Sequence, residues 1–427
     1  MPSRRALHAE ANRLLRLGDA GAAIRLFVAL LRAAPHDLDA RLRLADALAR
    51  AGYERDALDA LGALLVEAVG SGYPLVAIAA LKRLVAVDAA ASGLFTELAS
   101  RYASDTRRPG PGARTSLPDP DAEVPPHAFP PGAWDDAQVA AGVLGMLLGR
   151  DGLPPWPGTV PAIPLLSSLP ADAFARFVSA ASLRQVPADE DVLREGDAAA
   201  SFFVVARGRV AVVRGPQTLV TLGEGSVFGE MALLSNAPRN ATVRVLDDAD
   251  LLEFGRDALR AAADEVPAIA AALDRFMQQR LLAHALATHR FFAPFPPEQR
   301  HLLAARFVAR TAQPGEVLIT EGSTDAGLFV LLAGEVEVTA RGREGAPQHL
   351  ATLGAGEVFG EISVLGQTPA TATVTARTAA RALELPRPLA ARLVEGVAPL
   401  RAWLSDLADA RAMDTQLARS AADDVLT

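Results

Sequence analysis

The chain has 427 residues, of which half are apolar and 22% charged, and this indicates a folded protein with more than one domain. The formal net charge of −8 argues against a nucleic-acid-binding surface. The lack of cysteine excludes disulfides and cysteine-ligated metals, and the seven histidines show no spacing typical of a metal site. No signal peptide is visible and the longest uncharged apolar stretch, 137–149, is too short to span a bilayer, so we expect a cytoplasmic protein without cofactor or metal.

Residues 1–104 are predicted to be helical, because apolar side chains recur there at spacings of three and four residues. The chain around Gly18 and Ala23 matches the chain around Gly52 and Ala57 at a displacement of 34 residues. This period resembles a tetratricopeptide repeat, whose stacked helices form a groove for a peptide or partner helix. An unspecialised helical bundle is the alternative.

Residues 105–162 are predicted to be a proline-rich linker. Thirteen of the thirty prolines fall between residues 105 and 164, and proline denies backbone donors to helices and sheets. Within this stretch, residues 134–150 have the composition of one short helix.

Two similar β-rich domains follow, predicted at 163–289 and 290–427. Each shows short β-prone segments separated by glycines and ends in helix, which favours a jelly-roll barrel with flanking helices. The copies match glycine by glycine: Gly196 with Gly322, Gly208 with Gly334, Gly229 with Gly360. The predicted fold class is therefore α+β and multidomain, with a helical repeat followed by a tandem pair of barrels.

One motif occurs once in each barrel, and it carries the chemistry. Residues 228–243 read F-G-E-M-A-L-L-S-N-A-P-R-N-A-T-V, and residues 359–374 read F-G-E-I-S-V-L-G-Q-T-P-A-T-A-T-V. The glycine opens a short helix whose free N–H groups suit an anion, and it lets a ligand approach the backbone. Glu230 and Arg239 are a plausible grip for a sugar hydroxyl beside a phosphate.

Each half resembles a cyclic-nucleotide-binding domain, and the pair is similar to the tandem domains of a cAMP-dependent protein kinase regulatory subunit. The resemblance implies that Glu230 binds the ribose 2′-hydroxyl and Arg239 the phosphate, with the backbone of Asn240 and Ala241 nearby. Gly229 and Met231 complete the expected ligand-binding set. The ligand is then cAMP or cGMP. Threonine after the arginine accompanies cGMP and alanine cAMP in that family; Asn240 is neither, and we lean towards cAMP.

The second copy is predicted to be degenerate. It keeps Gly360 and Glu361 and offers the hydroxyl of Thr371, but Ala370 replaces the arginine. Losing two charge-assisted bonds, about 3–6 kcal/mol, costs roughly 10²–10⁴-fold in affinity. Nothing in the sequence places another arginine (Arg377 and Arg381 are candidates) in this pocket, so we expect a packing partner that reads the state of the first barrel. Four candidate lids for a purine base are expected in the core instead: Phe276, Met277, Phe291, Phe292.

The hypothesis that follows is a non-enzymatic cyclic-nucleotide receptor that regulates a protein partner through its helical repeats. The chain has no P-loop, no G-x-S-x-G and no kinase signature, which argues against an enzyme. No basic recognition helix follows the barrels, which argues against a transcription factor. We expect no nucleic-acid or membrane partner. A scaffold whose two barrels are both inert is the remaining alternative.

Overall fold

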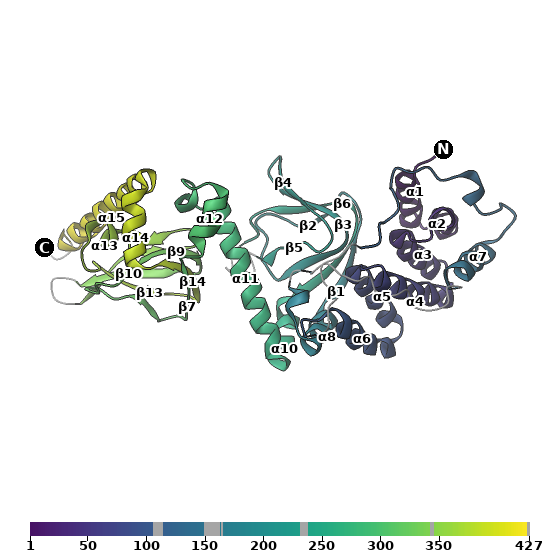
Figure 1. Ribbon diagram of the computed structural model, residues 1–427, viewed down its shortest axis with the longest axis horizontal. Coiled ribbons are helices and arrows are strands. Elements are labelled where there is room, and N and C mark those ends of the chain that lie inside the picture. Colours follow the sequence, from purple (N-terminus) through teal and green to yellow (C-terminus); the bar gives the residue numbers. More distant parts are fainter. Residues whose placement is uncertain (106–113, 149–162, 164, 231–237, 342–345, 425–427) are drawn as a thin grey trace. The chain divides into compact units, whose positions relative to one another are not determined.

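The computed structural model describes the chain except residues 106–113, 149–162, 164, 231–237, 342–345 and 425–427, and it describes only the backbone of residues 414–424. The chain forms two compact units, Met1–Phe276 and Met277–Thr427, which are taken separately below. Figure 1 labels their elements. In the described part of the chain, no helix has the length and apolar character needed to cross a membrane.

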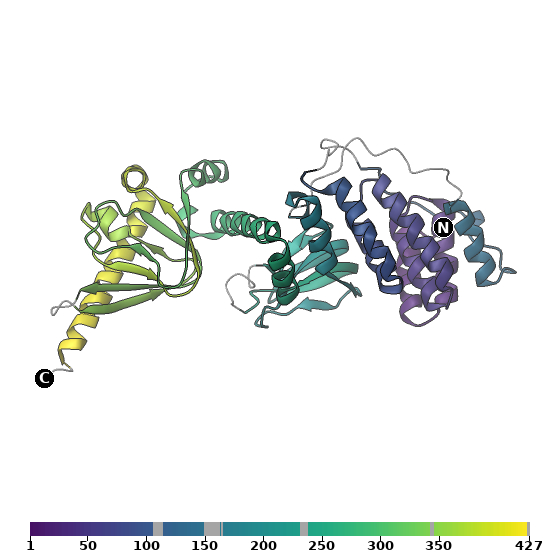
Figure 2. The same ribbon diagram turned by 90° about the horizontal axis from the view of Figure 1, so that it is seen from below.

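The first unit begins with a helical region, as predicted. Its helices are α1 (Arg4–Arg16), α2 (Ala20–Ala33), α3 (Leu38–Arg50), α4 (Glu54–Gly70), α5 (Pro74–Val87) and α6 (Leu94–Tyr102), with the short η1 (Ala89–Gly93) between the last two. Helices α1 to α5 each pack on the next and lie side by side in Figure 2. Gly18 and Gly52 end α1 and α3 at φ values of 87° and 86°, a conformation that favours glycine.

The 34-residue period is visible in the helix bounds. Helix α3 begins 34 residues after α1, and α4 begins 34 residues after α2. The small residues Ala23 and Ala57 are buried, as close helix contact requires. By sequence, residues 77–84 resemble the second helix of a further repeat, but the structure places them differently. Helix α5 follows α4 directly through a turn at Gly72 and so takes the place of a first helix.

Part of the stretch expected to be a linker packs on the helical region. The amide of Arg4 donates to the carbonyl of Ala122 at 2.9 Å, and Val124 is fully buried. After a short η2 (Pro126–Ala128), α7 (Asp136–Leu148) packs against α2 and α4 through a buried stripe that includes Val143. Proline-rich chain can thus be ordered without helix or sheet, because tertiary contacts satisfy its few backbone donors.

The first barrel completes this unit. After η3 (Leu166–Ser168) and α8 (Ala171–Ala180), its strands are β1 (Ser182–Val186), β2 (Asp191–Leu193), β3 (Ser201–Arg214), β4 (Gln217–Leu222), β5 (Val227–Phe228) and β6 (Thr242–Gly255). The sheet order is β1-β6-β3-β4, with β2 on β6 and β5 on β3. All pairs are antiparallel, and the core lies between the faces of this curled sheet. Helices α10 (Arg256–Glu265) and α11 (Pro267–Thr288) follow.

A buried cluster of charges joins the helical region to the first barrel. Asp250 of β6 is fully buried and accepts from Arg83 of α5 and Arg207 of β3, each at 2.9 Å. Arg83 also donates to Asp46 of α3 at 2.8 Å, and Arg207 pairs with Asp39. The helical region and the barrel therefore share one polar core as well as one compact unit.

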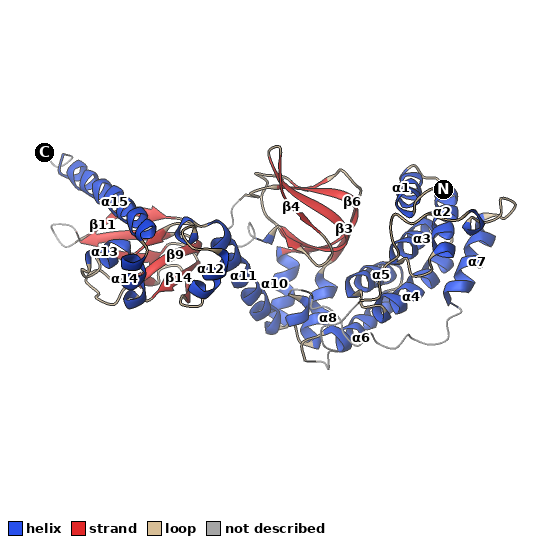
Figure 3. Cartoon of the chain, turned by 45° about the horizontal axis from the view of Figure 1, so that its top comes forward, coloured by secondary structure: helices blue, strands red, loops and turns tan. Residues whose placement is uncertain are grey.

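The second unit repeats the barrel. The 3₁₀ turn η4 (Arg290–Phe292) and α12 (Pro297–Ala304) precede it. The strands are β7 (Val308–Ala312), β8 (Val317–Ile319), β9 (Leu328–Ala333), β10 (Val336–Arg341), β11 (Pro347–Leu353), β12 (Val358–Phe359), β13 (Thr373–Ala376) and β14 (Ala380–Leu385). Helix α13 (Glu361–Gly366) lies between β12 and β13, and α14 (Arg387–Gly396) and α15 (Ala398–Asp424) follow the last strand. The strands form two four-stranded sheets, β11-β10-β13-β8 and β12-β9-β14-β7, which Figure 3 shows in red. The two β-sandwich domains with flanking helices confirm the predicted fold class at that level.

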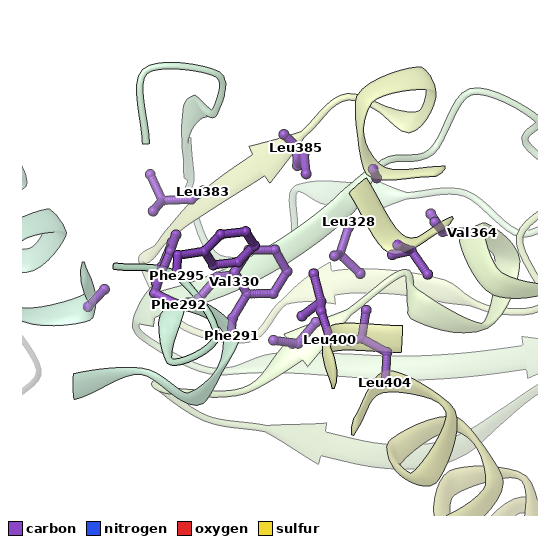
Figure 4. Packing of buried hydrophobic residues seen from close by; sticks show 14 of the residues in the cluster. Phe291, Phe292, Phe295, Leu328, Val330, Val364, Leu383, Leu385, Leu400 and Leu404 are labelled. Atoms are coloured by element: carbon purple, nitrogen blue, oxygen red, sulfur yellow. The ribbon is translucent and has the colours of Figure 1, made fainter. Parts of the chain in front are cut away.

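The aromatic cluster of the second unit lies in its core. Phe291 and Phe292 are both 0% exposed, and they pack with Phe295 against β9, β14 and α15. Figure 4 shows their rings among the leucines of these elements. The prediction that Phe291 and Phe292 are core residues is therefore confirmed, and Phe276 and Met277 are buried as well.

Candidate functional site

The first copy of the motif has a glycine whose conformation and position both disfavour a side chain. Gly229 follows β5 with a φ of 83°, in the left-handed region. A Cβ atom there would lie 3.0 Å from Nη1 of Arg239 and 3.1 Å from Cδ1 of Leu193. The close approach of Arg239 to this turn is thus a second reason for glycine, beside the backbone angle.

Arg239 is held from both sides by backbone carbonyls. Its Nη1 donates to the carbonyl of Gly229 at 2.6 Å, and its Nη2 donates to the carbonyl of Ser201 at 2.7 Å. Only 5% of the residue is exposed. These two bonds fix the plane of the guanidinium beside Gly229, so the side chain needs little reorganisation to meet a ligand.

The guanidinium lies in a buried, acidic surrounding. Burial lowers the pKa of Arg239, while the charges of Asp197, Glu253 and Glu230 act in the opposite direction. Its Nε is buried and has no hydrogen-bond partner among the residues that the structure describes. A buried guanidinium with a donor to spare suits an anionic group, because phosphate oxygens accept such bonds in pairs.

The remaining predicted residues of the first site are placed as follows. Glu230, next to Gly229, is 3% exposed. Asn240 is exposed, and its carbonyl accepts from Nε of Arg214 at 3.0 Å. Ala241 is buried and immediately precedes β6. Met231 lies outside the described residues.

The second copy keeps the backbone hydrogen bonds around the arginine position of the first and has an alanine there. The amide of Ala370 donates to the carbonyl of Ser323 at 2.9 Å, and its carbonyl accepts from the amide of Gly322 at 2.8 Å. Arg239 makes the same two backbone bonds with residues 196 and 197, each at 2.8 Å. The two positions are therefore equivalent in space as well as in sequence, and the second barrel presents a methyl group where the first presents a guanidinium.

A cavity of about 380 Å³ opens at this place in the second barrel. Gly360, Glu361, Ala370 and Thr371, the predicted residues of the degenerate site, all line it. Gly360 has a φ of 86° and caps the start of α13, and Glu361 is 2% exposed. The structure thus brings together the residues that the sequence grouped.

The arginine beside this cavity comes from α15, and the sequence analysis missed it. Nη1 of Arg411 donates to Oε1 of Glu361 at 2.9 Å and to the carbonyl of Val358 at 2.5 Å. Neither Arg377 nor Arg381 lines the cavity. A signal existed: Arg280 stands 131 residues before Arg411, which is the displacement between the two copies of the motif.

A larger cavity, of about 640 Å³, lies elsewhere in the first unit, between α1 and the paired strands β3 and β6. Arginines and aspartates alternate around it, so it offers no surface of one sign to a ligand: Arg4, Arg5, Arg16, Arg207 and Arg209 against Asp37, Asp39, Asp247 and Asp248. It contains no residue of the motif. Within the described ranges, no group of three histidine or acidic side chains is arranged to hold a metal ion.

Both barrels match one known protein family. The cyclic nucleotide-binding domain family matches residues 183–265 and 309–396. The cAMP-dependent protein kinase regulatory subunit of Yarrowia lipolytica is 29% identical over 280 residues, which cover 64% of this chain and 71% of the relative. That of Blastocladiella emersonii is 27% identical over 55% of this chain and 58% of its own length.

Among solved structures, the regulatory domain of Toxoplasma gondii PKA with cAMP is 23% identical and covers 58% of this chain and 92% of that one, with a TM-score of 0.27. Two segments of the chain thus match the cyclic nucleotide-binding domain family, and their tandem arrangement is similar to that of cAMP-dependent protein kinase regulatory subunits.

Proposed function

We propose that the protein is a non-enzymatic, cytoplasmic cAMP receptor whose first barrel holds the ligand. Arg239 would bind the cyclic phosphate and Glu230 the ribose 2′-hydroxyl, with the backbone at Gly229, Asn240 and Ala241 completing the site. The observation that carries this assignment is the buried guanidinium of Arg239, oriented by two backbone carbonyls and with its Nε donor unpartnered among the described residues. The regulatory subunits named above support cAMP over cGMP.

The helical region would carry the response to a protein partner. Its two 34-residue helix pairs are the basis for a tetratricopeptide-like groove, which suits a peptide or a partner helix. The buried charges of Asp250, Arg83 and Arg207 fix this region to the barrel that holds the ligand, so a change in the barrel reaches it through a stiff connection. The effect on the partner is bounded by the difference in ligand affinity between the two states. No observation favours a scaffold with two inert barrels.

Isothermal titration of the full chain, stripped of nucleotide, tests the proposal. We expect one site per chain for cAMP, with cGMP weaker. Arg239→Gln should weaken binding by roughly 10²–10⁴-fold, because two charge-assisted bonds to phosphate are lost. The matched control is Arg209→Gln, which removes the same charge from a side chain that is 57% exposed and should leave affinity unchanged.

Arg239 also bonds two buried carbonyls, so Arg239→Gln should cost about 1–3 kcal/mol of stability. Circular dichroism must therefore show that the variant is folded at the titration temperature. A folded Arg239→Gln protein that binds cAMP as the native chain does would refute the assignment.

A further inference from the structure

The larger cavity of the first unit, between α1 and the paired strands β3 and β6, has the size and the mixed lining of a small-molecule site. Its volume of about 640 Å³ lies within the range of about 300–1,000 Å³ that ligand pockets span. Part of its wall is apolar and is formed by Leu117, Pro118, Pro120 and Leu246. Leu117 is 50% exposed and Leu246 is 39% exposed, so both offer apolar surface that a ligand can cover.

The less exposed charges at this cavity form one connected chain. Asp37 accepts from Arg4 and from Nε2 of His8, the latter at 2.8 Å. Nδ1 of His8 lies 3.2 Å from Oδ2 of Asp39, and Oδ1 of Asp39 accepts from Nη1 of Arg207. All five side chains line the cavity. They come from the helical region and from β3, so a ligand held by this chain contacts both the helices and the barrel.

The chain leaves a donor and an acceptor unused at neighbouring positions. Nη2 of Arg207 is buried and has no hydrogen-bond partner among the residues that the structure describes, and the same is true of Nδ1 of His8, whose approach to Asp39 lacks hydrogen-bond geometry. Asp39 is partly exposed and keeps Oδ2 to accept with. Because Nη1 of Arg207 holds the other oxygen of Asp39, the unused Nη2 and the carboxylate lie side by side.

This pattern selects among ligand classes. A polyanion at this cavity would meet four aspartates, and a polycation would meet five arginines. A wholly apolar molecule would leave the buried donor of Arg207 unpaired, and a sugar would place hydroxyls against the apolar wall. A zwitterion with an apolar body meets all three demands. An α-amino acid carries its carboxylate and its ammonium on one carbon, which suits a donor and an acceptor that are neighbours.

We propose that this cavity binds a free α-amino acid with an apolar side chain. Its carboxylate accepts from Nη2 of Arg207, its ammonium donates to Asp39, and its side chain lies against Leu117 and Leu246. Arg5, Arg16 and Arg209 line the more exposed part of the cavity, which is larger than one amino acid needs. The site uses no residue of the nucleotide-binding motif, so it is a second ligand site that does not depend on cAMP binding in the first barrel.

Calorimetric titration of the full chain with L-leucine, L-methionine and L-phenylalanine tests the proposal. We expect one site per chain for at least one of them. The two analogues of that amino acid that lack either the amine or the carboxylate should each bind about 10- to 100-fold more weakly, because each loses a charge-assisted bond. For leucine these analogues are isocaproate and isoamylamine.

Two variants locate the site. Ala9 is exposed on α1 and lines the cavity, so Ala9→Trp should fill it and abolish binding without removing a charge. The matched control is Ala6→Trp, because Ala6 is exposed on the same helix and does not line the cavity. Asp39→Asn should weaken the amino acid about 10- to 100-fold and change the affinity for isocaproate little, since isocaproate has no ammonium. Asp121→Asn, on an exposed side chain outside the lining, should have no effect.

Thermal melting must show that each variant is folded at the titration temperature, and Ala9→Trp remains decisive if Asp39→Asn does not fold. The proposal is overturned if the folded native chain takes up none of the three amino acids, or if either single-charge analogue binds as tightly as its parent. It is also overturned if folded Ala9→Trp protein binds the amino acid as the native chain does. Failure of cAMP to bind would refute the proposed function alone, since these titrations contain no nucleotide.

Discussion

Replacing Arg83 with methionine tests whether the buried charges hold the helical region to the first barrel. The side chain is 10% exposed and bonds Asp46 and Asp250, at 2.8 and 2.9 Å. Burial alone raises the pKa of Asp250, but Arg83 and Arg207 outweigh it and lower that pKa below its ordinary value of 3.8. Methionine keeps the length of the side chain and removes the charge, so Asp250 would stay buried with the bond from Arg207 alone.

The expected cost follows from that burial. Removing one partner of a buried ion pair costs about 3–5 kcal/mol, because the other charge is left without compensation in a poorly solvated place. The pair of Arg209 and Asp247 provides the contrast, since its side chains are 57% and 49% exposed. Exposed pairs contribute less than about 1 kcal/mol, so Arg209→Met should be nearly neutral.

Hydrogen exchange followed by mass spectrometry is the assay, because it resolves the two units within one chain. Amides of α5 and β6 that exchange only when the first unit opens should exchange on the order of 10²–10⁴-fold faster in Arg83→Met. Peptides from the second unit serve as the internal reference. If Arg83→Met accelerates exchange no more than Arg209→Met does, the cluster does not hold these elements together.

Two further predictions concern stability. Gly334→Ala should destabilise the second unit by at least about 1–3 kcal/mol, because φ is 85° and the new Cβ would lie 2.4 Å from a backbone carbonyl oxygen. The control is Gly322→Ala, where φ is 86° but the Cβ would meet no atom within 4 Å, so it should cost less stability in a urea titration. Equal costs for the two variants would refute the clash. Burial alone lowers the pKa of His8, but Asp37 and Asp39 raise it above 6.5, so its stabilising charge is present below pH 6.5 and is lost as pH rises through the folded pKa. The stability difference between the native chain and His8→Gln should therefore shrink with rising pH, and a flat difference would contradict the assignment.

Much of the fold could be predicted from patterns among residues that are close together in the chain. The helical period depends on residues that are neighbours in the chain, so the match between Gly18 and Gly52 predicted turns that the structure places at φ values of 87° and 86°. The same holds for Gly229 and Gly360, where one backbone angle is required after a short strand. Duplication helped as well, because each barrel's glycines predict the turns of the other.

The features that the sequence did not reveal depend on pairing across long separations. Arg83 and Asp250 stand 167 residues apart and Arg411 and Glu361 stand 50 apart, and no local spacing brings either pair together. The ordered proline-rich stretch is a related case. Its composition is typical of a linker, but Val124 is buried and its amide donates to the carbonyl of Pro2, a contact that only the tertiary structure supplies.

The two barrels share a backbone frame at the arginine position of the motif but differ in where their arginine comes from. Arg239 and Ala370 have equivalent backbone hydrogen bonds, and the motif acid is almost fully buried in both barrels. In the first barrel the arginine belongs to the motif itself, and two carbonyl oxygens orient it while its Nε has no hydrogen-bond partner among the described residues. In the second barrel the arginine is Arg411, which comes from α15 and is paired with Glu361, so the protein's own carboxylate neutralises its charge. The alanine at position 370 and the pairing of Arg411 with the motif acid therefore act in the same direction, because each reduces the positive charge that an anionic ligand would meet in the second cavity.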